Sequence, residues 1–406
     1  MYSNSRKRNK YIFARRKKSY YVVRAVGAAI GVVVLALLIM FIYVNLFGIN
    51  SKVHLTESHP AAEINSDVMA SSFIESIDDG GTVSQDAAVD TSALGKTECT
   101  VVISIDGKEK EYFMNVEIQD TTPPVIECGS AVNVLKGSSP DMTAAAKAGD
   151  NSGEEIDVRL SGDYSTDEPG SFDLSFAASD SSGNETIQDF TLNVIDISDY
   201  SSIPESLKDE DGNVSFVTDK GFEGNIDRNG VTTVDGTVIV NGSIPLQPGY
   251  GPGLTADMYN AFTEMRAAAA SDGLSIYMLY GYRGYSIQNS RYATMTANFG
   301  EDEAKLYCAE AGRSEHQTGL AADINTSNDR ANPELAAEFA ATDEGKWLNE
   351  NCYKYGFIIR YPDGKEAETG FAYAPWHVRY VGKELAETLY NGSDWITLEE
   401  YYGLPA

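Results

Sequence analysis

The sequence predicts a membrane-anchored chain that carries β-sandwich segments and ends in an α+β domain, with helices around a small antiparallel sheet. Three observations predict this fold. A basic head precedes a long uncharged apolar run, residues 90–120 and 165–196 repeat one hairpin pattern, and helical and strand periodicities alternate after Thr237. A spacing of 3.6 residues between apolar side chains indicates a helix, and a spacing of two indicates a half-buried strand.

Charge is distributed unevenly along the 406 residues. The chain has 31 lysines and arginines against 60 aspartates and glutamates, which gives a formal net charge of −29 at pH 7. Nine of the basic residues and none of the acidic ones lie in residues 1–24, so the rest of the chain has 22 basic residues and a net charge of −38. A body this acidic repels nucleic acid, and we expect no nucleic-acid partner.

Residues 25–48 are predicted to form a transmembrane helix that follows a basic cytoplasmic tail, residues 1–24. No charged residue occurs from Ala25 to Ser51, and about 20 apolar residues are enough to cross a hydrocarbon core of about 30 Å. A buried core helix is disfavoured by the length of the run and its basic flank. A cleaved signal peptide would have a shorter apolar region, of about 7–15 residues. The basic tail places the N-terminus in the cytoplasm and the later residues on the extracytoplasmic, cell-wall side.

Gly27 and Gly31 form a GxxxG pair inside this predicted span. Such a pair allows two membrane helices to approach closely. In a segment rich in alanine, valine and glycine the match is weak, so dimerisation through these two glycines is only weakly suggested.

Four cysteines follow the predicted span, namely Cys99, Cys128, Cys308 and Cys352. Disulfides persist outside the cytoplasm. Of the two pairings considered, Cys308–Cys352 is favoured over Cys99–Cys128 because both partners fall in one predicted domain. Free, buried thiols are an equally open interpretation. No CxxC pair occurs, which argues against a zinc cluster held by thiolates.

The two hairpin segments point to a repeated β domain. Residues 90–120 and 165–196 each contain a glycine, an alternating strand, a turn, a second alternating strand and a closing aspartate. Alternation bounded by turn residues predicts β-hairpins. Repetition of one hairpin-rich unit accounts for both segments better than chance does.

The joins beside these segments resemble those of bacterial Ig-like cell-surface repeats. They read DTTPPVIE at 120–127 and GDNSGEEIDV at 149–158. The resemblance implies an Ig-like β-sandwich at 121–197 and a partial Ig-like domain at 63–120. Such domains are spacers or adhesion modules, and spacer is the favoured interpretation because no binding face is evident.

The remaining segments complete the predicted organisation. Residues 49–62 are expected to be a tether and residues 198–236, which are acidic and rich in glycine and serine, a linker with some strand. Residues 237–406 form the α+β domain. Within it we expect helices at 255–271, 286–298, 302–311 and 343–356, and strands at 275–282, 321–324, 357–362 and 377–382.

Only two histidines occur beyond residue 60, and both lie in the predicted α+β domain. His316 lies in SEHQTGLAADI, and Asp323 follows it by seven residues on a predicted strand; His377 lies on another strand. Catalytic zinc takes three nitrogen or oxygen ligands and leaves a fourth position for water. Each histidine alone is more often a surface or core residue. Together the three residues predict an open, water-activating metal site.

Longer motifs around these residues resemble a known family. They are SxHxxGxAxD at 314–323, PWHxRYVG at 375–382, GYRGYxxQ at 281–288 and WLNENCYKYGFIIRYP at 347–362. The domain from about residue 240 onward closely resembles the zinc D-alanyl-D-alanine carboxypeptidases of the VanY type, the M15B peptidases. The resemblance implies hydrolysis of the last peptide bond of a peptidoglycan stem peptide, with release of D-alanine.

Carried over residue by residue, the resemblance makes His316, Asp323 and His377 the ligands of Zn²⁺. Arg283 would pair with the substrate carboxylate or with the oxyanion that forms at the scissile carbonyl, since its guanidinium fork suits both. A structural ion pair is the alternative for Arg283. Gln288 and Ser314 would form hydrogen bonds to the substrate, although either is also suited to a turn or cap.

One position departs from the family pattern. The family has a glutamate three residues before its last histidine, and here that position is Ala374. The glutamate takes a proton from the zinc-bound water and delivers it to the leaving amine. A positioned general base contributes about 10²–10⁴-fold in rate, so we expect impaired activity. Glu366 and Glu368 are candidate substitutes, whereas Glu315 is a poor one because neighbours on an extended segment point apart.

Three functions therefore stay open. The first is a membrane-anchored carboxypeptidase that is weakly active or uses another base. The second is an inactive wall-binding pseudoenzyme, and the third is an Ig-like adhesin with a vestigial peptidase domain. The sequence leaves open whether the residue before the cleaved bond has a D- or an L-centre, and whether Ala374 is natural or introduced.

Overall fold

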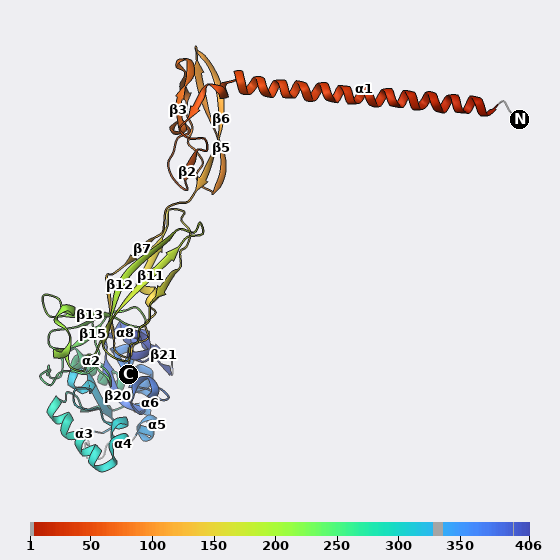
Figure 1. Ribbon diagram of the computed structural model, residues 1–406. Coiled ribbons are helices and arrows are strands. Elements are labelled where there is room, and N and C mark those ends of the chain that lie inside the picture. The colour runs from red at the N-terminus through yellow and green to blue at the C-terminus, as the bar shows by residue number, and fades with distance from the viewer. Residues whose placement is uncertain (1–3, 328–335, 393) are drawn as a thin grey trace. The chain divides into compact units, whose positions relative to one another are not determined.

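The computed structural model describes residues 4–327, 336–392 and 394–406. It begins with one long helix, α1 (Asn4–Phe47), drawn in red in Figure 1. Within α1 the stretch Tyr21–Tyr43 is apolar and long enough to cross a membrane. The helix thus contains the predicted span and continues into the basic tail, whose residues 1–3 lie outside the described part.

The chain divides into two compact units. The first consists of residues 1–124 together with two short segments, 149–155 and 179–184. The second contains the other residues from 125 to the C-terminus.

The first unit contains a complete β-sandwich. Its larger sheet has the strand order β2-β6-β5-β4, and β1 pairs with β3 in a second sheet. The strands are β1 (Val53–Leu55), β2 (Ala61–Glu63), β3 (Ile74–Ile77), β4 (Thr82–Gln85), β5 (Gly95–Ile105) and β6 (Lys108–Gln119). Alternate residues of β5 and β6 are buried, among them Val101, Ile103 and Val116. β1 and β2 lie in the segment 49–62, so the expected tether is instead part of the sandwich.

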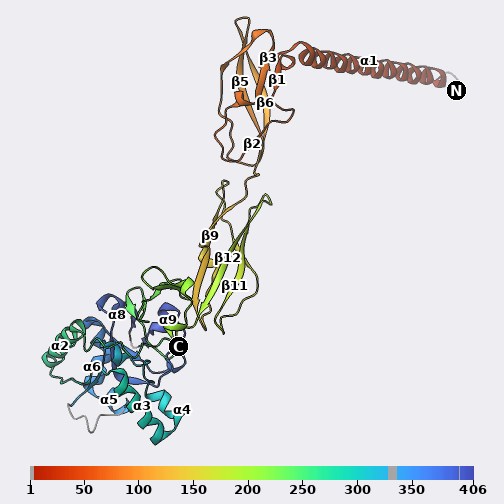
Figure 2. The ribbon, with the colours of Figure 1, turned by 60° about the vertical axis from the view of Figure 1, so that its left-hand side comes forward.

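A second sandwich repeats this topology strand for strand. The strands are β7 (Val125–Cys128), β8 (Ala131–Leu135), β9 (Ala146–Gly149), β10 (Val158–Ser161), β11 (Gly170–Ser179) and β12 (Glu185–Ile195). The larger sheet has the order β8-β12-β11-β10, and β7 pairs with β9. In both sandwiches the first strand of the larger sheet pairs in parallel with its last strand. The long hairpin strands of both sandwiches are labelled in Figure 2.

Residues 198–236 form ordered structure where a linker was expected. They contain β13 (Val214–Val217), β14 (Glu223–Ile226) and β15 (Thr232–Val234), which join β16 (Thr237–Val238) in a four-stranded antiparallel sheet. The inward side chains of this sheet, Val214, Phe216, Ile226 and Val234, belong to the core cluster of the C-terminal domain. The strand expected within this segment is observed as β13. The prediction of a linker around it was wrong, because acidic, glycine-rich turns separate the four apolar positions.

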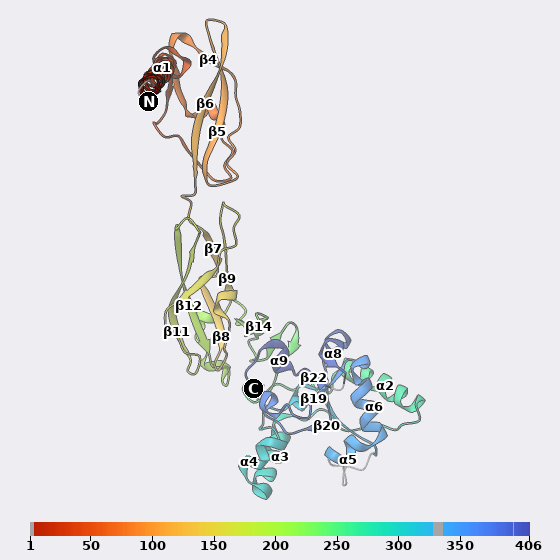
Figure 3. The ribbon, with the colours of Figure 1, turned by 90° about the vertical axis from the view of Figure 1, so that its right-hand side faces the viewer.

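The C-terminal domain is built on an antiparallel sheet with the order β17-β18-β20-β19. Its strands are β17 (Tyr277–Tyr280), β18 (Ala321–Asn325), β19 (Phe357–Tyr361) and β20 (Ala374–Tyr380). Figure 3 shows β19 and β20 with α6, α8 and α9 around them. The predicted α+β architecture is therefore observed, and both central strands carry predicted site residues.

The helices of this domain cover the sheet and complete its core. They are α2 (Ala256–Ser271), α3 (Tyr285–Phe299), α4 (Glu301–Tyr307), α5 (Ala336–Ala341), α6 (Asp343–Asn351), α7 (Glu366–Thr369), α8 (Lys383–Leu389) and α9 (Leu398–Tyr402). A two-stranded ribbon, β21 (Tyr390–Asn391) and β22 (Asp394–Trp395), precedes α9. In α2 the predicted apolar face is buried, with Met258, Phe262, Met265 and Ala269 all below 6% exposed.

All four cysteines are free thiols. The favoured bridge between Cys308 and Cys352 is therefore absent, although both residues are buried in the C-terminal domain. Cys308 ends α4 and Cys352 begins a 3₁₀ turn after α6. Membership of one predicted domain does not bring two residues into bonding distance, and the free buried thiols that the sequence left open are observed instead.

Candidate metal centre

The structure brings His316, Asp323 and His377 together at the centre of the C-terminal sheet. Their nitrogen and oxygen ligand atoms all lie within 4.8 Å of one another. Asp323 and His377 are direct partners across the antiparallel pair β18–β20. His316 comes from a short 3₁₀ turn, η7 (Glu315–Thr318), that leads into β18.

Hydrogen bonds hold the three side chains in this arrangement. Asp323 Oδ1 lies 2.9 Å from His377 Nδ1, and Asp323 Oδ2 lies 3.2 Å from His316 Nε2. On the far side of its ring, His316 Nδ1 lies 2.6 Å from the carbonyl oxygen of Gly281. That carbonyl fixes the ring so that Nε2 points toward Asp323, the arrangement that metal-binding histidines use.

Gly319 explains how His316 can approach the sheet. Its backbone is left-handed, with φ of 69°, and it ends the 3₁₀ turn. A Cβ atom at this position would lie 1.8 Å from the carbonyl oxygen of Gly253. Only glycine tolerates both the positive φ and this close approach. The glycine of the SxHxxGxAxD motif is therefore required for the turn that positions the histidine.

Glu315 is a site residue that sequence reasoning dismissed. It lies in the 3₁₀ turn and not on an extended segment, so the argument that neighbours point apart does not apply. Its carboxylate is fully buried, and its Oε2 lies 3.4 Å from His377 Nε2. Two guanidinium groups hold its Oε1, with distances of 2.7 Å to Arg360 Nε and 3.0 Å to Arg379 Nη1.

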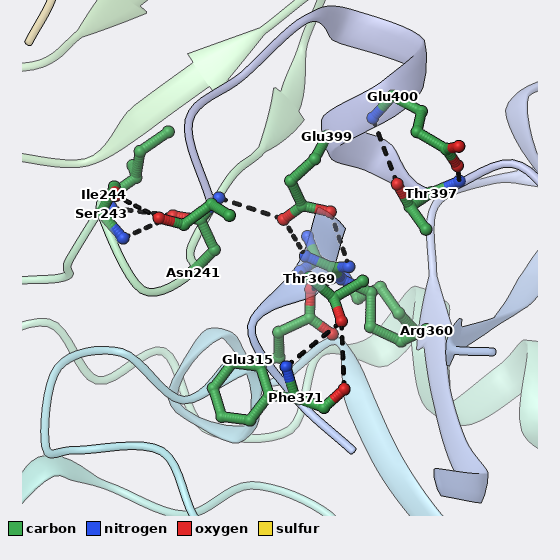
Figure 4. Close-up of polar contacts among 12 residues, drawn as sticks. Asn241, Ser243, Ile244, Glu315, Arg360, Thr369, Phe371, Thr397, Glu399 and Glu400 are labelled. Atoms are coloured by element: carbon green, nitrogen blue, oxygen red, sulfur yellow. Dashed lines mark hydrogen bonds and ion pairs between the residues drawn. The ribbon is translucent and has the colours of Figure 1, made fainter. Parts of the chain in front are cut away.

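The two arginines are part of a larger buried network, and Figure 4 shows the part of it around Arg360. Arg360 also binds Glu399 of α9 through two hydrogen bonds of 2.6 and 2.9 Å. Asn241 donates to the same Glu399 carboxylate at 3.0 Å. An arginine inside an apolar strand requires a carboxylate partner. The strings FIIRY at 357–361 and WHVRY at 376–380 each place an arginine in such a strand, so they were the sequence signal for these buried ion pairs.

The pKa values of four titratable side chains in the site are shifted in different directions. These side chains are Glu315, His316, Asp323 and His377. Burial opposes ionisation of Glu315, but Arg360 and Arg379 hold its pKa well below the usual range. Burial lowers the pKa of His316 despite the nearby Asp323. For His377 burial acts in the same direction, yet its bonds to Asp323 and Glu315 raise the pKa overall. Asp323 is likewise buried, and the two histidines bring its pKa well below the usual value.

These residues fit a catalytic zinc ion. Zinc binds imidazole nitrogen and carboxylate oxygen, and a site with three such ligands leaves a position for water. His316 Nε2, His377 Nδ1 and the Asp323 carboxylate already converge, and the other nitrogen of each ring faces an oxygen that would orient it. Outer partners of this kind are typical of zinc-binding histidines.

Arg283 lies next to this group of side chains. Its backbone N–H donates to the carbonyl oxygen of His316 at 3.0 Å. Its Nε is buried and has no hydrogen-bond partner, and no ion pair of Arg283 occurs among the described residues. Burial lowers the pKa of this guanidinium, while the charge of Asp323 acts in the opposite direction. The alternative of a structural ion pair is therefore not supported.

Gln288 and Ser314, the two predicted substrate-binding residues, are both buried. The amide nitrogen of Gln288, on α3, donates to the carbonyl oxygen of Ala309 at 2.5 Å, while its Oε1 is buried without a partner. Its nitrogen thus has a structural role. Ser314 precedes the 3₁₀ turn and is 4% exposed, and its hydroxyl does not cap that turn.

Ala374 is the first residue of β20, opposite Tyr361 of β19. The methyl group is partly exposed. Glu366 and Glu368 lie on the short helix α7, and in the described chain neither forms a hydrogen bond or ion pair with the three metal-site residues. Glu368 Oε2 is buried without a partner.

Comparisons with known proteins agree on one family. Residues 252–383 match the family model described as VanY, D-alanyl-D-alanine carboxypeptidase. The putative carboxypeptidase YodJ of Bacillus subtilis is 43% identical over 143 residues, which are 35% of this chain and 51% of that protein. The chain spans between 38% and 51% of the length of three curated relatives that it matches.

Solved structures of related enzymes also match this domain. A zinc complex of a glutamate-to-alanine variant of the D,D-pentapeptidase VanY, from a VanB-type resistance cassette, is 30% identical; the match covers 40% of this chain and 96% of that one, with a TM-score of 0.35. The LD-carboxypeptidase LdcB is 36% identical, and its match covers 40% and 88% of the two chains, again with a TM-score of 0.35.

Proposed function

Since this chain belongs to the VanY family through its C-terminal domain, we propose that it is a zinc carboxypeptidase of the cell wall, anchored in the membrane by α1. It removes the terminal D-alanine from peptidoglycan stem peptides. The observation that carries this proposal is the convergence of His316, Asp323 and His377 on two paired strands and the turn before them.

In this proposal the two histidines and Asp323 hold the metal. When bound, zinc lowers the pKa of a coordinated water to about 7 and polarises the substrate carbonyl. The chain's own residues do the rest. Gly281 O and Glu315 fix the two imidazole rings, and Asp323 spans between them.

Arg283 is assigned to the anionic end of the substrate. Its guanidinium has a buried donor without a partner beside the metal site, and an arginine fork pairs with a carboxylate through two parallel hydrogen bonds. A carboxypeptidase must recognise a free terminal carboxylate, and the unpartnered guanidinium of Arg283 is suited to bind it. Gln288 Oε1 and Ser314 Oγ remain proposed hydrogen-bonding groups for the peptide.

Ala374 limits the rate that this site can reach. A methyl group neither accepts the proton of an attacking water nor donates one to the leaving amine. Binding by zinc and Arg283 does not require residue 374, so the proposal is an enzyme impaired in proton transfer, by about 10²–10⁴-fold if the base made its typical contribution.

The same residue supports a second candidate function. A protein that keeps the metal site and Arg283 but has no base would recognise stem peptides without cleaving them. This wall-binding pseudoenzyme differs from the first proposal in turnover and not in affinity. The third function, an adhesin with a vestigial peptidase domain, gains no support from the convergence of His316, Asp323 and His377.

The membrane anchor is proposed from the apolar stretch Tyr21–Tyr43 and the nine basic residues before Ala25. By the positive-inside rule the N-terminus is cytoplasmic, and the β-sandwiches and the C-terminal domain are then extracytoplasmic, where peptidoglycan lies. A signal sequence would share these features but would be removed.

The test is D-alanine release by the full chain in detergent, with and without a zinc chelator. Two peptides are compared: a pentapeptide stem that ends in two D-alanines, and a tetrapeptide whose terminal D-alanine follows an L-centre. Release that stops with chelator and in His316→Ala supports the enzyme, and the preferred peptide identifies its specificity. Zinc-dependent binding by calorimetry without release at high enzyme concentration supports the pseudoenzyme. Absence of both binding and release refutes both proposals.

A further inference from the structure

A second cluster of carboxylates lies in the first compact unit. Asp120 directly follows β6, Asp150 lies in the short segment 149–155, and Asp180 lies in the turn between β11 and β12. One carboxylate oxygen of each lies within 4.8 Å of the other two. The three residues are far apart in the sequence, so the fold itself brings them together.

Asp120 lacks any partner in this cluster. Asp120 is only 8% exposed. Both of its carboxylate oxygens are buried and have no hydrogen-bond partner. Asp150 Oδ2 and the amide oxygen Asn151 Oδ1 are also buried and unpartnered. A buried carboxylate without a donor costs far more than a buried apolar group. The cluster and the residue next to Asp150 therefore contain four buried oxygens without a hydrogen-bond partner.

The donors near the cluster are already in use. Glu63 accepts hydrogen bonds from the backbone N–H groups of Thr121 and Thr122, at 2.9 and 3.1 Å, and from Asn151 Nδ2 at 3.1 Å. Asn184 Nδ2 donates to Asp180 Oδ2 at 2.8 Å and to the carbonyl oxygen of Asp120 at 3.1 Å. The segments are thus held in place by bonds that leave the Asp120 carboxylate free.

No protein cation compensates for these charges. Among the described residues, no lysine or arginine forms an ion pair with Asp120, Asp150 or Asp180. Burial and the neighbouring carboxylates of Asp150 and Asp180 raise the pKa of Asp120. Carboxylates this close either keep a proton on one of them or surround a positive ion.

The donor atoms indicate which ion this is. All of them are oxygens, from three carboxylates and one amide, with neither imidazole nor thiol nearby in the cluster. Hard cations prefer oxygen ligands, and Ca²⁺ accepts six to eight of them in irregular geometry, whereas Mg²⁺ requires a near-ideal octahedron and keeps most of its water. Several protein oxygens crowded around a buried aspartate favour calcium.

We propose that Asp120, Asp150 and Asp180, with the amide oxygen of Asn151, form a calcium site in the first compact unit. The ion neutralises the Asp120 carboxylate and ties the end of β6 to the segments 149–155 and 179–184. Calcium is then a structural ligand of the β-sandwich region, separate in position and in chemistry from the zinc site.

The test uses the full chain in detergent, freed of calcium with EGTA and loaded with zinc after the chelator has been removed. Calorimetric titration should give one bound Ca²⁺ per chain. Hydrogen exchange should show that calcium slows amide exchange in 149–155 and 179–184. Asp120→Asn should weaken calcium binding at least tenfold and abolish this protection. The matched control is Asp67→Asn, which removes the same charge from an exposed position of the same unit and should change neither.

Two further measurements make the proposal refutable. In calcium-free buffer, Asp120→Asn should unfold at or above the temperature of the parent chain, because it removes a repelled charge; a lower temperature would mean that the carboxylate has a structural partner of its own, against the proposal. Mg²⁺ should bind at least tenfold more weakly than Ca²⁺, and equal affinity would overturn the calcium assignment. No calcium binding by the parent chain would overturn the site itself.

Discussion

Asp323 and His377 lie directly opposite each other on β18 and β20, and Asp323 Oδ1 is 2.9 Å from His377 Nδ1. Strand register thus fixes two of the three proposed zinc ligands, because the backbone hydrogen bonds of the pair set the distance between their side chains. The third, His316, depends on the turn at Gly319. Two of the site residues are therefore held by paired strands, and the third, His316, is positioned by a tight turn.

The central position of Asp323 makes its carboxylate the most sensitive point of the metal site. We expect Asp323→Asn to keep the shape of the side chain but to lower zinc affinity by more than the roughly 10–100-fold that loss of an outer partner costs. Zinc content after dialysis and calorimetric titration measure this effect. Asp343→Asn, on the exposed end of α6, is the control for the charge change. Unchanged zinc affinity in Asp323→Asn would remove this residue from the ligand set.

Restoring a carboxylate at residue 374 should raise activity. Ala374→Glu places a proton acceptor at the start of β20, the strand that also carries His377. If the rest of the site is competent, D-alanine release should increase by about 10²–10⁴-fold. The matched control is Ala374→Gln, which has nearly the same shape but cannot accept and return a proton.

The comparison of these two variants separates positioning from proton transfer. An equal gain in both would mean that side-chain size at residue 374 matters and not its chemistry. No gain in either, with zinc and peptide still bound, would place the defect elsewhere in the site.

The sequence was sufficient to predict that His316, Asp323 and His377 come together, but not what surrounds them. His316, Asp323 and His377 occur in motifs with fixed spacing, and the strands around them have clear periodicity. Glu315 was missed because its direction depends on a 3₁₀ turn that an isolated string of residues does not reveal. The sheet at 214–238 was missed since each of its strands is only two to four residues long.

The β region shows the same limit in another form. Long hairpins at 95–119 and 170–195 were predictable from alternation, and the repeat extends to every strand of the two sandwiches. The short edge strands β1 and β2 carry too few residues for a pattern, so their segment read as a tether. The cysteine pairing failed because bonding distance is a property of the folded chain.

Glu63 should make the stability of the first unit depend on acid pH. Burial raises the pKa of its carboxyl, but hydrogen bonds from Thr121, Thr122 and Asn151 outweigh burial and lower it to about 2. A depressed pKa stabilises the fold above the unfolded value near 4.5, and this contribution is lost as pH falls from about 4.5 toward 2. Calorimetry in calcium-free buffer across this range should show the loss.

The calorimetric transition of the first unit can be identified by following tryptophan fluorescence in parallel. All three tryptophans, Trp347, Trp376 and Trp395, lie in the C-terminal domain. Unfolding of the first unit leaves their fluorescence unchanged. Glu63→Gln should flatten the pH dependence of that transition between about 4.5 and 2, whereas Glu98→Gln, at an exposed position of β5, should not. An identical slope in Glu63→Gln and the parent chain would contradict this assignment.

Glu315 should be among the most costly residues to remove, although it neither binds zinc nor accepts a proton in the proposed reaction. Its loss leaves Arg360 and Arg379 with an uncompensated buried charge, and breaking a buried pair in this way costs about 3–5 kcal/mol.

Urea unfolding followed by tryptophan fluorescence measures the free energy of unfolding of the C-terminal domain in Glu315→Ala. The control is Glu310→Ala, whose half-exposed carboxylate pairs with Arg313 at 3.3 Å and should change that free energy by less than about 1 kcal/mol. Glu315→Gln, which keeps an acceptor for His377 Nε2, should lose less zinc affinity than Glu315→Ala. Equal stability of Glu315→Ala and Glu310→Ala would show that the buried network contributes little to this fold.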